Sequence, residues 1–225
     1  MKTIFTILFI ISFSVFSFSQ KNTTSIYGGL NFSTWTGNAN GFAENLVEET
    51  IDLQWLSKYD YENKFRLGFT IGFNMEFKIS GNFYFQPGVS YSQKGTGFKG
   101  FNKNVDMSIE RKLKMITNFI ELPLLYKINI PSGKETFYLF GGPVIGYLID
   151  SKISAKIDTY FRTMNLENCN SFQINLNIGA GIDFCKKFKI EIKYDAGLSS
   201  VFDTHIADNY NLKNSTISIC FAYHN

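Results

Sequence analysis

The segment at residues 65–77, FRLGFTIGFNMEF, alternates without a break between large apolar residues and small or polar ones. Its odd positions hold Phe, Leu, Ile or Met, and its even positions hold Arg, Gly, Thr, Asn or Glu. Because successive side chains of a β-strand point to opposite faces, this pattern predicts a long strand with one apolar and one polar face. A soluble barrel would turn the apolar face inward, whereas a membrane barrel would turn it outward to lipid.

Eight segments of the chain alternate with this period, and together they predict an all-β fold. The segment 136–149 is apolar on both faces, so its orientation stays open. The eight predicted strands are residues 24–34, 65–79, 82–93, 116–129, 136–149, 171–185, 187–200 and 214–224.

The connections between these strands alternate between long and short. Long connections precede residue 65 and occupy 95–115 and 150–170, a medium one spans 201–213, and short ones lie at 80–82, 130–135 and 186–187. Outer-membrane barrels have long extracellular loops and short periplasmic turns, and about 10 residues suffice for a tilted crossing strand. The pattern therefore predicts an eight-stranded antiparallel up-and-down transmembrane β-barrel.

The polar faces of the predicted strands indicate which side points inward. They are rich in glycine and amides, which suit the narrow interior of an eight-stranded barrel, whereas glycine weakens a strand whose surface faces solvent. The opposite faces carry large apolar residues, with Phe and Tyr near the strand ends, as in the aromatic girdles of membrane barrels. The residues expected to face lipid include Phe69, Ile71, Phe73, Leu122, Leu124, Ile178, Ile192 and Ile219.

Charged residues on the polar faces would then point into the lumen, and acidic and basic groups are evenly matched there. Buried charges persist only when they are paired or hydrated, so a balanced set favours a cross-braced plug. The alternative is a narrow pore, which needs continuous water past Glu121 and Lys193. The lumen charges expected from the alternation are Arg66, Glu76, Lys78, Glu121, Lys127, Asp183, Lys189, Glu191, Lys193 and Asp195.

The first residues have the order of a secretory signal peptide. Lys2 precedes an uncharged run of Phe, Ile and Leu, and small residues follow at Ser17 and Ser19. We expect cleavage after Ser19, which leaves a barrel domain at 20–225; an uncleaved membrane anchor is the alternative.

Three cysteines, Cys169, Cys185 and Cys220, are neither a disulfide framework nor a zinc pattern. We expect isolated apolar side chains there, with a single disulfide as the alternative.

Prolines lie inside three predicted strands, at Pro87, Pro123 and Pro143. Each removes one hydrogen-bond donor from the sheet, so we expect local bulges or a displaced register at these positions.

Three segments of the chain resemble recurring parts of the PorT-like outer-membrane β-barrel proteins, also described as a porin family. They are FYFQPGVSYSQKG at 83–95, FIELPLLYKI at 119–128 and YLFGGPVIGYLI at 138–149. The resemblance extends over the mature chain and implies the outer membrane of a Gram-negative cell, with no enzyme activity. Such barrels commonly end on an aromatic residue recognised by the barrel-insertion machinery. This chain ends in FAYHN, so Tyr223 would serve that purpose two residues early.

Other motifs give weak evidence of chemistry. Gly95, Gly97 and Gly100 match a dinucleotide fingerprint, but the preceding strand is amphipathic, so a glycine-rich loop is the better interpretation. His205 lies between two carboxylates, yet no second His or Cys is near in sequence to complete a metal site. Glu121 and Asp195 could form an acid pair as in glycosidases, although braced lumen carboxylates are commoner. We expect no catalytic, cofactor or metal site.

The first two long connections carry opposite charge. We expect them to pair across the rim and cap the barrel. Separately, residues 42–55 have the spacing of a short amphipathic helix, with a plain loop as the alternative. The acidic residues are Glu44, Glu48, Glu49, Asp52, Asp60 and Glu62; the basic ones are Lys94, Lys99, Lys103, Arg111, Lys112 and Lys114.

These features favour a structural or surface-recognition protein of the outer membrane. The expected partners are outer-membrane lipid, the barrel-insertion machinery and an extracellular or secretion-system protein; the small net charge of +3 gives no sign of a nucleic-acid partner. The alternatives are a narrow channel for small solutes, an accessory to a secretion system, and a soluble lipocalin-like carrier with its apolar face inward.

Overall fold

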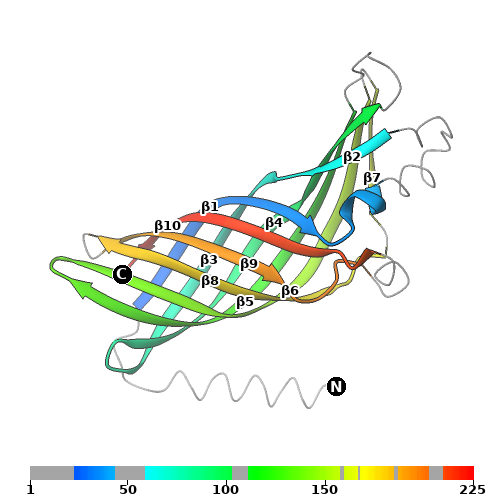
Figure 1. Ribbon diagram of the computed structural model, residues 1–225. Helices are drawn as coiled ribbons and strands as arrows, with labels where there is room; N and C mark the ends of the chain where they lie inside the picture. Colours follow the sequence, from blue (N-terminus) through cyan, green and yellow to red (C-terminus); the bar gives the residue numbers. More distant parts are fainter. Residues whose placement is uncertain are drawn as a thin grey trace, which may run out of the picture.

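A computed structural model describes residues 23–43, 59–102, 111–157, 160–166, 168–184, 187–202 and 210–225 (Figure 1). The predicted signal peptide at 1–19 lies outside these residues. Within them, no helix has both the length and the apolar character needed to cross a membrane.

Eight long strands form a closed ring, as predicted. Each strand pairs antiparallel with its neighbours, and the first strand closes the ring by pairing with the last. The strands of the ring are β1 (Thr23–Thr36), β3 (Arg66–Ser80), β4 (Phe83–Asn102), β5 (Arg111–Ser132), β6 (Glu135–Ile157), β8 (Phe172–Phe184), β9 (Phe188–Gly197) and β10 (Lys213–His224). The all-β barrel expected from period-two alternation is therefore confirmed.

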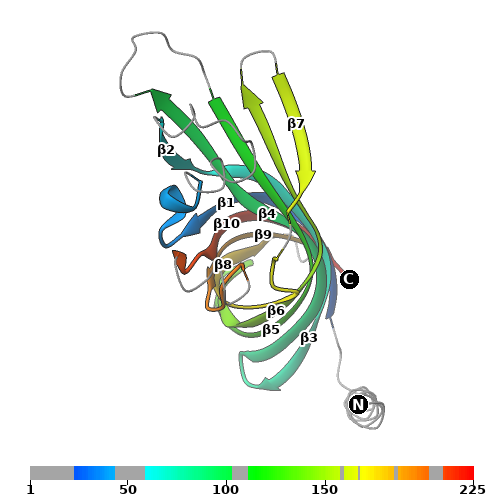
Figure 2. The ribbon, with the colours of Figure 1, turned by 90° about the vertical axis from the view of Figure 1, so that its right-hand side faces the viewer.

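Two short strands extend this ring at the end where the long connections lie. β2 (Tyr59–Lys64) pairs with β4, and β7 (Tyr160–Asn165) pairs with β6. Together with the ends of β4, β5 and β6 they form a sheet that projects beyond the barrel and leans away from its axis (Figures 1 and 2). We call this part the projecting sheet; its strand segments are 59–64, 97–102, 111–116, 152–157 and 160–165.

The projecting sheet corrects the predicted loops. Residues 95–102 and 111–115 continue β4 and β5, and residues 150–157 continue β6. The glycine-rich segment 95–100 is thus a strand and not a loop, because β5 pairs along its whole length and β2 joins it on the other side from Gly97 onward.

The outer surface of the ring is apolar, as the alternation predicted. Phe69, Ile71 and Leu122 are 45%, 54% and 42% exposed, and Leu124 is half-buried. Exposed side chains also include Phe73, Ile178, Ile192 and Ile219. A soluble lipocalin-like carrier needs the opposite orientation, so that alternative is excluded.

The orientation of β6, which the sequence left open, follows from its register. Tyr138, Phe140 and Val144 are buried inside the ring, while Leu139 and Ile145 are exposed outside it. The inner side chains fit because glycines lie opposite them: Gly181 adjoins the ring of Tyr138, and Gly179 adjoins that of Phe140.

The strand prolines do not displace the register, contrary to expectation. Pro87 and Pro123 lie beside short gaps in the pairing, but the same register continues on either side of each gap, and Pro143 pairs in register with Leu176. Each proline lacks a backbone donor and so removes one hydrogen bond. The closed sheet tolerates this loss because the neighbouring hydrogen bonds remain. The register shifts lie elsewhere, between Lys78 and Ser80 and between Asn118 and Phe119.

A hydrophobic core fills the end of the barrel where the projecting sheet begins. We call it the loop-end cluster. A short helical turn at 39–43 contributes to it, and the rings of Phe42 and Phe202 lie 4.7 Å apart, with Trp35 5.4 Å from Phe202. Its buried members are Trp35, Ala39, Phe42, Ala43, Tyr61, Phe98, Leu113, Met115, Ile153, Val201, Phe202 and Leu212.

Candidate functional site

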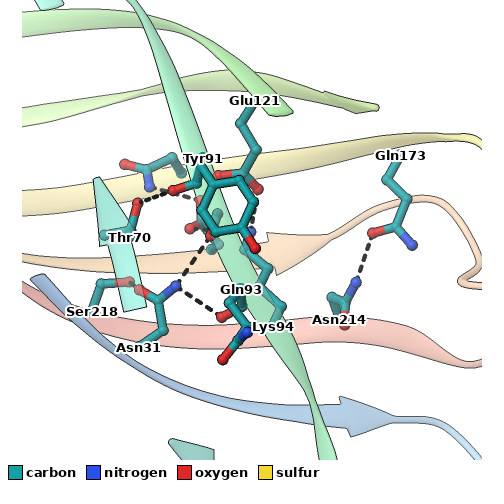
Figure 3. Close-up of polar contacts among 12 residues, drawn as sticks. Asn31, Thr70, Tyr91, Gln93, Lys94, Glu121, Gln173, Asn214 and Ser218 are labelled. Atoms are coloured by element: carbon teal, nitrogen blue, oxygen red, sulfur yellow. Dashed lines mark hydrogen bonds and ion pairs between the residues drawn. The ribbon is translucent and has the colours of Figure 1, made fainter. Parts of the chain in front are cut away.

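The interior of the barrel below the loop-end cluster is polar and tightly bonded (Figure 3). The amide of Asn31 on β1 donates to the hydroxyl of Ser92 on β4 at 3.1 Å and to the carbonyl of Phe69 on β3 at 3.0 Å. Ser218 on β10 donates to the amide oxygen of Asn31 at 2.8 Å. One buried amide thus connects four strands, because the even positions of β4 and β10 and the odd positions of β1 all point inward.

The first of two charge clusters is centred on Lys94. Its Nζ lies 2.6 Å from Oε1 of Glu121 and 3.6 Å from Oδ2 of Asp195, and Asn177 donates to the other oxygen of Asp195 at 2.7 Å. All four side chains are buried. Lys94 therefore bridges the two carboxylates that could have formed a glycosidase-like acid pair.

The second charge cluster is centred on Glu76. Its Oε1 contacts Nζ of Lys127 at 2.9 Å and also Nζ of Lys189. The ammonium of Lys127 lies 3.9 Å from the centre of the Tyr138 ring, and the Tyr138 hydroxyl donates to Glu191 at 3.0 Å. Strands β3, β5, β6 and β9 are thereby braced across the interior.

The other charges expected in the lumen lie at its two ends or beside an aromatic ring. Arg66 donates to the side chain of Gln93 at 2.8 Å, and Nζ of the half-buried Lys193 lies 4.7 Å from the centre of the Tyr27 ring. Near the carboxyl end of the chain, Oδ2 of Asp183 lies 3.0 Å from Nε2 of His224.

Two lysines lie at places that the alternation alone does not describe fully. Lys78 is opposite Tyr84 on β4, in the same register as the inward-facing residues before it, but its side chain is exposed because β3 reaches its turn there. Lys94, expected on a basic rim loop, is only 1% exposed and lies inside the barrel. The even positions Ser90 and Ser92 also point inward, so continuing the alternation by one more step would have found it.

A small polar cavity lies in the interior of the barrel, lined by described residues. Its volume is about 20 Å³, which holds about one water molecule. Glu121 and Lys193 both line it, together with Asn74, Gln86 and Asn177. A cavity of this size is far below the several hundred cubic ångströms of a typical small-molecule site.

The remaining sequence motifs find no site in the described part of the chain. Gly95, Gly97 and Gly100 lie within an antiparallel strand, whereas the glycines of a dinucleotide fold lie in a turn after a parallel strand. No group of three potential metal-binding side chains occurs among the described residues, and His205 lies outside them. Cys169 and Cys220 are free thiols, and Cys185 also lies outside.

The two oppositely charged connections meet in part as paired strands. Glu62 on β2 lies opposite Lys99 on β4, but the carboxylate of Glu62 contacts Lys64 on its own strand at 2.6 Å. The acidic residues at 44–52 lie outside the described residues, as does most of the predicted amphipathic segment 42–55; its first residue, Phe42, packs in the loop-end cluster.

Comparison with known families decides the class of this barrel. Residues 17–203 match the family described as outer membrane protein beta-barrel domain. The chain belongs to this family. Its place is therefore the outer membrane, where the exposed apolar surface of the barrel meets the lipid bilayer.

Solved structures that resemble this outer-membrane barrel share little sequence with it. Ail, the attachment invasion locus protein of Yersinia pestis, is 13% identical with a TM-score of 0.45, covering 92% of this chain and 100% of Ail. Neisserial surface protein A is 11% identical with a TM-score of 0.38, covering 89% and 96%. The N-terminal β-barrel domain of Pseudomonas aeruginosa OprF is 9% identical with a TM-score of 0.31, covering 89% and 97%. A search of curated proteins gave no match.

Proposed function

We propose that this protein is a closed, non-enzymatic outer-membrane barrel whose interior is a structural plug and whose function lies in recognition at the cell surface. The observation that carries the proposal is that two separate groups of side chains close the barrel, one after the other along its length. The charge clusters of Lys94 and Glu76 cross the interior, and the loop-end cluster covers the end from which the projecting sheet extends.

The ion pairs of the interior support a plug because they join strands on different sides of the ring. Lys94, Lys127 and Lys189 are each at most 2% exposed, and each contacts a carboxylate from another strand. A conducting lumen would keep such groups hydrated along a continuous path. In this barrel, the cavity that Glu121 and Lys193 line has room for about one water molecule.

The loop-end cluster supports the same conclusion at the outer end. Trp35, Met115 and Phe202 are at most 1% exposed, and they come from three separate parts of the chain. An apolar layer of this kind is a barrier to ions, because an unpaired charge in an apolar medium is very costly.

The finer assignments of the protein are part of this proposal. We place it with the PorT-like barrels on the basis of the segments 83–95, 119–128 and 138–149. Residues 1–19 serve as a cleaved signal peptide, so that the purified protein begins at Gln20. Tyr223, half exposed on the outer surface of β10, is the aromatic residue that the insertion machinery recognises.

Conductance in planar lipid bilayers tests the plug directly. We expect the purified wild-type protein to show no discrete current steps, in bilayers where a porin of known conductance gives clear steps. Insertion of the folded barrel is checked by its heat-modifiable migration on a gel. Reproducible steps from the folded wild-type protein would overturn the plug and favour the narrow-channel alternative. An accessory role in secretion would instead appear as specific capture of a secretion component from native membranes.

A further inference from the structure

The projecting sheet has two edge strands, one on each side. Among the strands that the structure describes, β2 pairs only with β4, and β7 pairs only with β6. Figure 2 shows β7 at the side of the sheet, with no described strand beyond it. An edge strand presents a row of backbone N–H and C=O groups, and these groups can pair with a further strand.

The edge of β2 is partly covered by other parts of the barrel. The backbone N–H of Asn63 on β2 donates to the side chain of Asn40 at 3.1 Å, and the amide of Asn63 donates to the carbonyl of Trp35 at 2.5 Å. The helical turn at 39–43 and the end of β1 thus supply partners along this edge. Coverage of this kind is one way in which proteins keep edge strands from pairing with other chains.

The register of β7 shows which of its backbone groups point away from β6. Leu166 lies opposite Ser151 in continuation of this register, and its N–H donates to the Ser151 carbonyl at 3.0 Å. In an antiparallel pair, residues that exchange hydrogen bonds alternate with residues whose N–H and C=O groups point to the other side. The N–H and C=O groups of Phe161, Thr163 and Asn165 therefore point to the open edge of β7.

β7 contains neither of two features that commonly block an edge, a proline and a bulge. Its sequence, YFRTMN, has no proline, and its register with β6 runs without a shift over all six residues. Tyr, Phe and Thr are also residues that favour strands. The open edge of β7 is therefore suited to pairing with one more strand.

The side chains of β7 indicate what kind of strand fits beside it. Phe161 is 65% exposed on the outer face of the projecting sheet, and Thr163 and Asn165 are exposed on the same face. Arg162 is exposed on the opposite face, on which Met164 packs against the loop-end cluster. A strand with an apolar side chain beside Phe161 and a carboxylate beside Arg162 would be favoured, because such pairs stabilise a sheet.

We propose that β7 is a docking edge for an extended segment of an extracellular protein, which joins the projecting sheet as an antiparallel strand. The backbone groups of Phe161, Thr163 and Asn165 provide affinity, while Phe161 and Arg162 select the side chains of the segment, as in other cases of strand addition. The inference rests on the recognition part of the proposed function. Conductance by the wild-type protein would overturn the plug and leave the docking edge intact.

Selection from a displayed library of short random peptides tests the docking edge, with the full-length mature protein folded in lipid nanodiscs as the target. The test variant is Thr163→Pro, which removes one N–H from the open edge and none of the hydrogen bonds to β6. The matched control is Thr163→Ala, which keeps this N–H. Both variants lose the same contact between the hydroxyls of Thr163 and Ser154, 3.1 Å apart in the wild type.

A second measurement on the wild-type protein changes the peptide and leaves β7 intact. Each selected peptide is synthesised in two N-methylated forms, one methylated at its odd positions and the other at its even positions. Because the N–H groups of a strand alternate between its two sides, only one form loses the donors that face β7. The comparison of the two forms therefore decides the proposal even where Thr163→Pro disturbs β7 itself.

Selected peptides should bind the wild type and Thr163→Ala with affinities within about twofold. Thr163→Pro should bind them at least about tenfold more weakly, because it loses a donor and places a ring at the centre of the edge. One N-methylated form should lose at least about tenfold in affinity and the other less than about twofold. Heat-modifiable migration should persist in both variants. A selection that yields no such peptide, or peptides that bind the wild type and Thr163→Pro equally, would overturn the proposal, as would equal effects of the two N-methylated forms.

Discussion

Glu76 is the carboxylate at the centre of the second charge cluster. Its carboxylate contacts two buried ammonium groups, so Glu76→Ala leaves both Lys127 and Lys189 without this counter-ion. Breaking a buried ion pair from one side costs about 3–5 kcal/mol. We expect a loss of this size in the free energy of unfolding, measured by urea titration in lipid vesicles.

The matched control for Glu76→Ala is Glu62→Ala, which removes a carboxylate from an exposed ion pair with Lys64. Surface pairs contribute about 0–1 kcal/mol, so this change should have little effect. Replacing Glu76, Lys127 and Lys189 together by leucine removes all three charges and should recover part of the stability. A loss below 1 kcal/mol for Glu76→Ala would contradict the brace.

Cys169 offers a pH-dependent test beside the loop-end cluster. Burial raises the pKa of its thiol from the ordinary 9.0 to about 11, although a hydrogen bond with Ser151 opposes this shift. The thiolate is the reactive form, so alkylation by iodoacetamide at pH 8 should be about a hundredfold slower than in the unfolded chain. The rate should rise as the pH approaches 11.

Site-resolved mass spectrometry measures the alkylation of Cys169, with the urea-unfolded protein as the control. The neutral thiol is the form that the fold favours, so its contribution to stability is present below pH 9 and is lost as the pH rises through 11. Alkylation of the folded and unfolded protein at equal rates at pH 8 would contradict the burial of this side chain.

At the scale of single residues, alternation predicts the face of a side chain but not its partner. The inward positions of Glu76, Glu121 and Lys127 follow directly from period two. Their pairing does not, because it depends on the height of each residue along the barrel, which the stagger between strands determines. Lys94 was missed because the predicted strand ended one residue before it.

At the scale of strands, the sequence predicts the eight members of the ring but underestimates the length of three of them. β4, β5 and β6 are 20, 22 and 23 residues long. Their extensions contain lysines and glycines, which are uncommon in strands, so the sequence alone predicts loops there. They form strands because they pair with one another and because β2, from before β3 in the chain, and β7, directly after β6, supply further pairing partners.

We expect disruption of the loop-end cluster to affect the long connections next to it and not the ring of strands. Phe202→Ala removes the ring that contacts both Trp35 and Phe42, and truncating a buried Phe costs about 3–5 kcal/mol of local packing. We expect faster proteolysis of the long connections in limited digestion, while heat-modifiable migration persists because the ring closes without this side chain.

A control for Phe202→Ala is Phe172→Ala, which truncates a side chain that is 66% exposed on the outer surface. It should leave the proteolysis pattern unchanged. Identical digestion of the Phe202→Ala variant and the wild type would show that the cluster does not hold the connections in place.

At the scale of the whole molecule, alternation did not decide whether the apolar faces of the strands point to lipid or to the interior. Glycine and amides on the polar faces indicated the inside, and the aromatic residues indicated the lipid boundary. The lean of the projecting sheet was not predictable, because the extensions of β4, β5 and β6 that form this sheet look like loops in the sequence. The open edge of β7 therefore becomes visible only in three dimensions.

The central claim is that apolar side chains face lipid around a closed polar interior. The most direct test places a nitroxide spin label at Ile71, Leu122 or Ile178, in a background with the native cysteines replaced by serine, and reconstitutes the protein in lipid vesicles. At all three positions we expect frequent collisions with oxygen, which concentrates in hydrocarbon, and few with a water-soluble nickel complex. Frequent collisions with the nickel complex and few with oxygen would contradict the account.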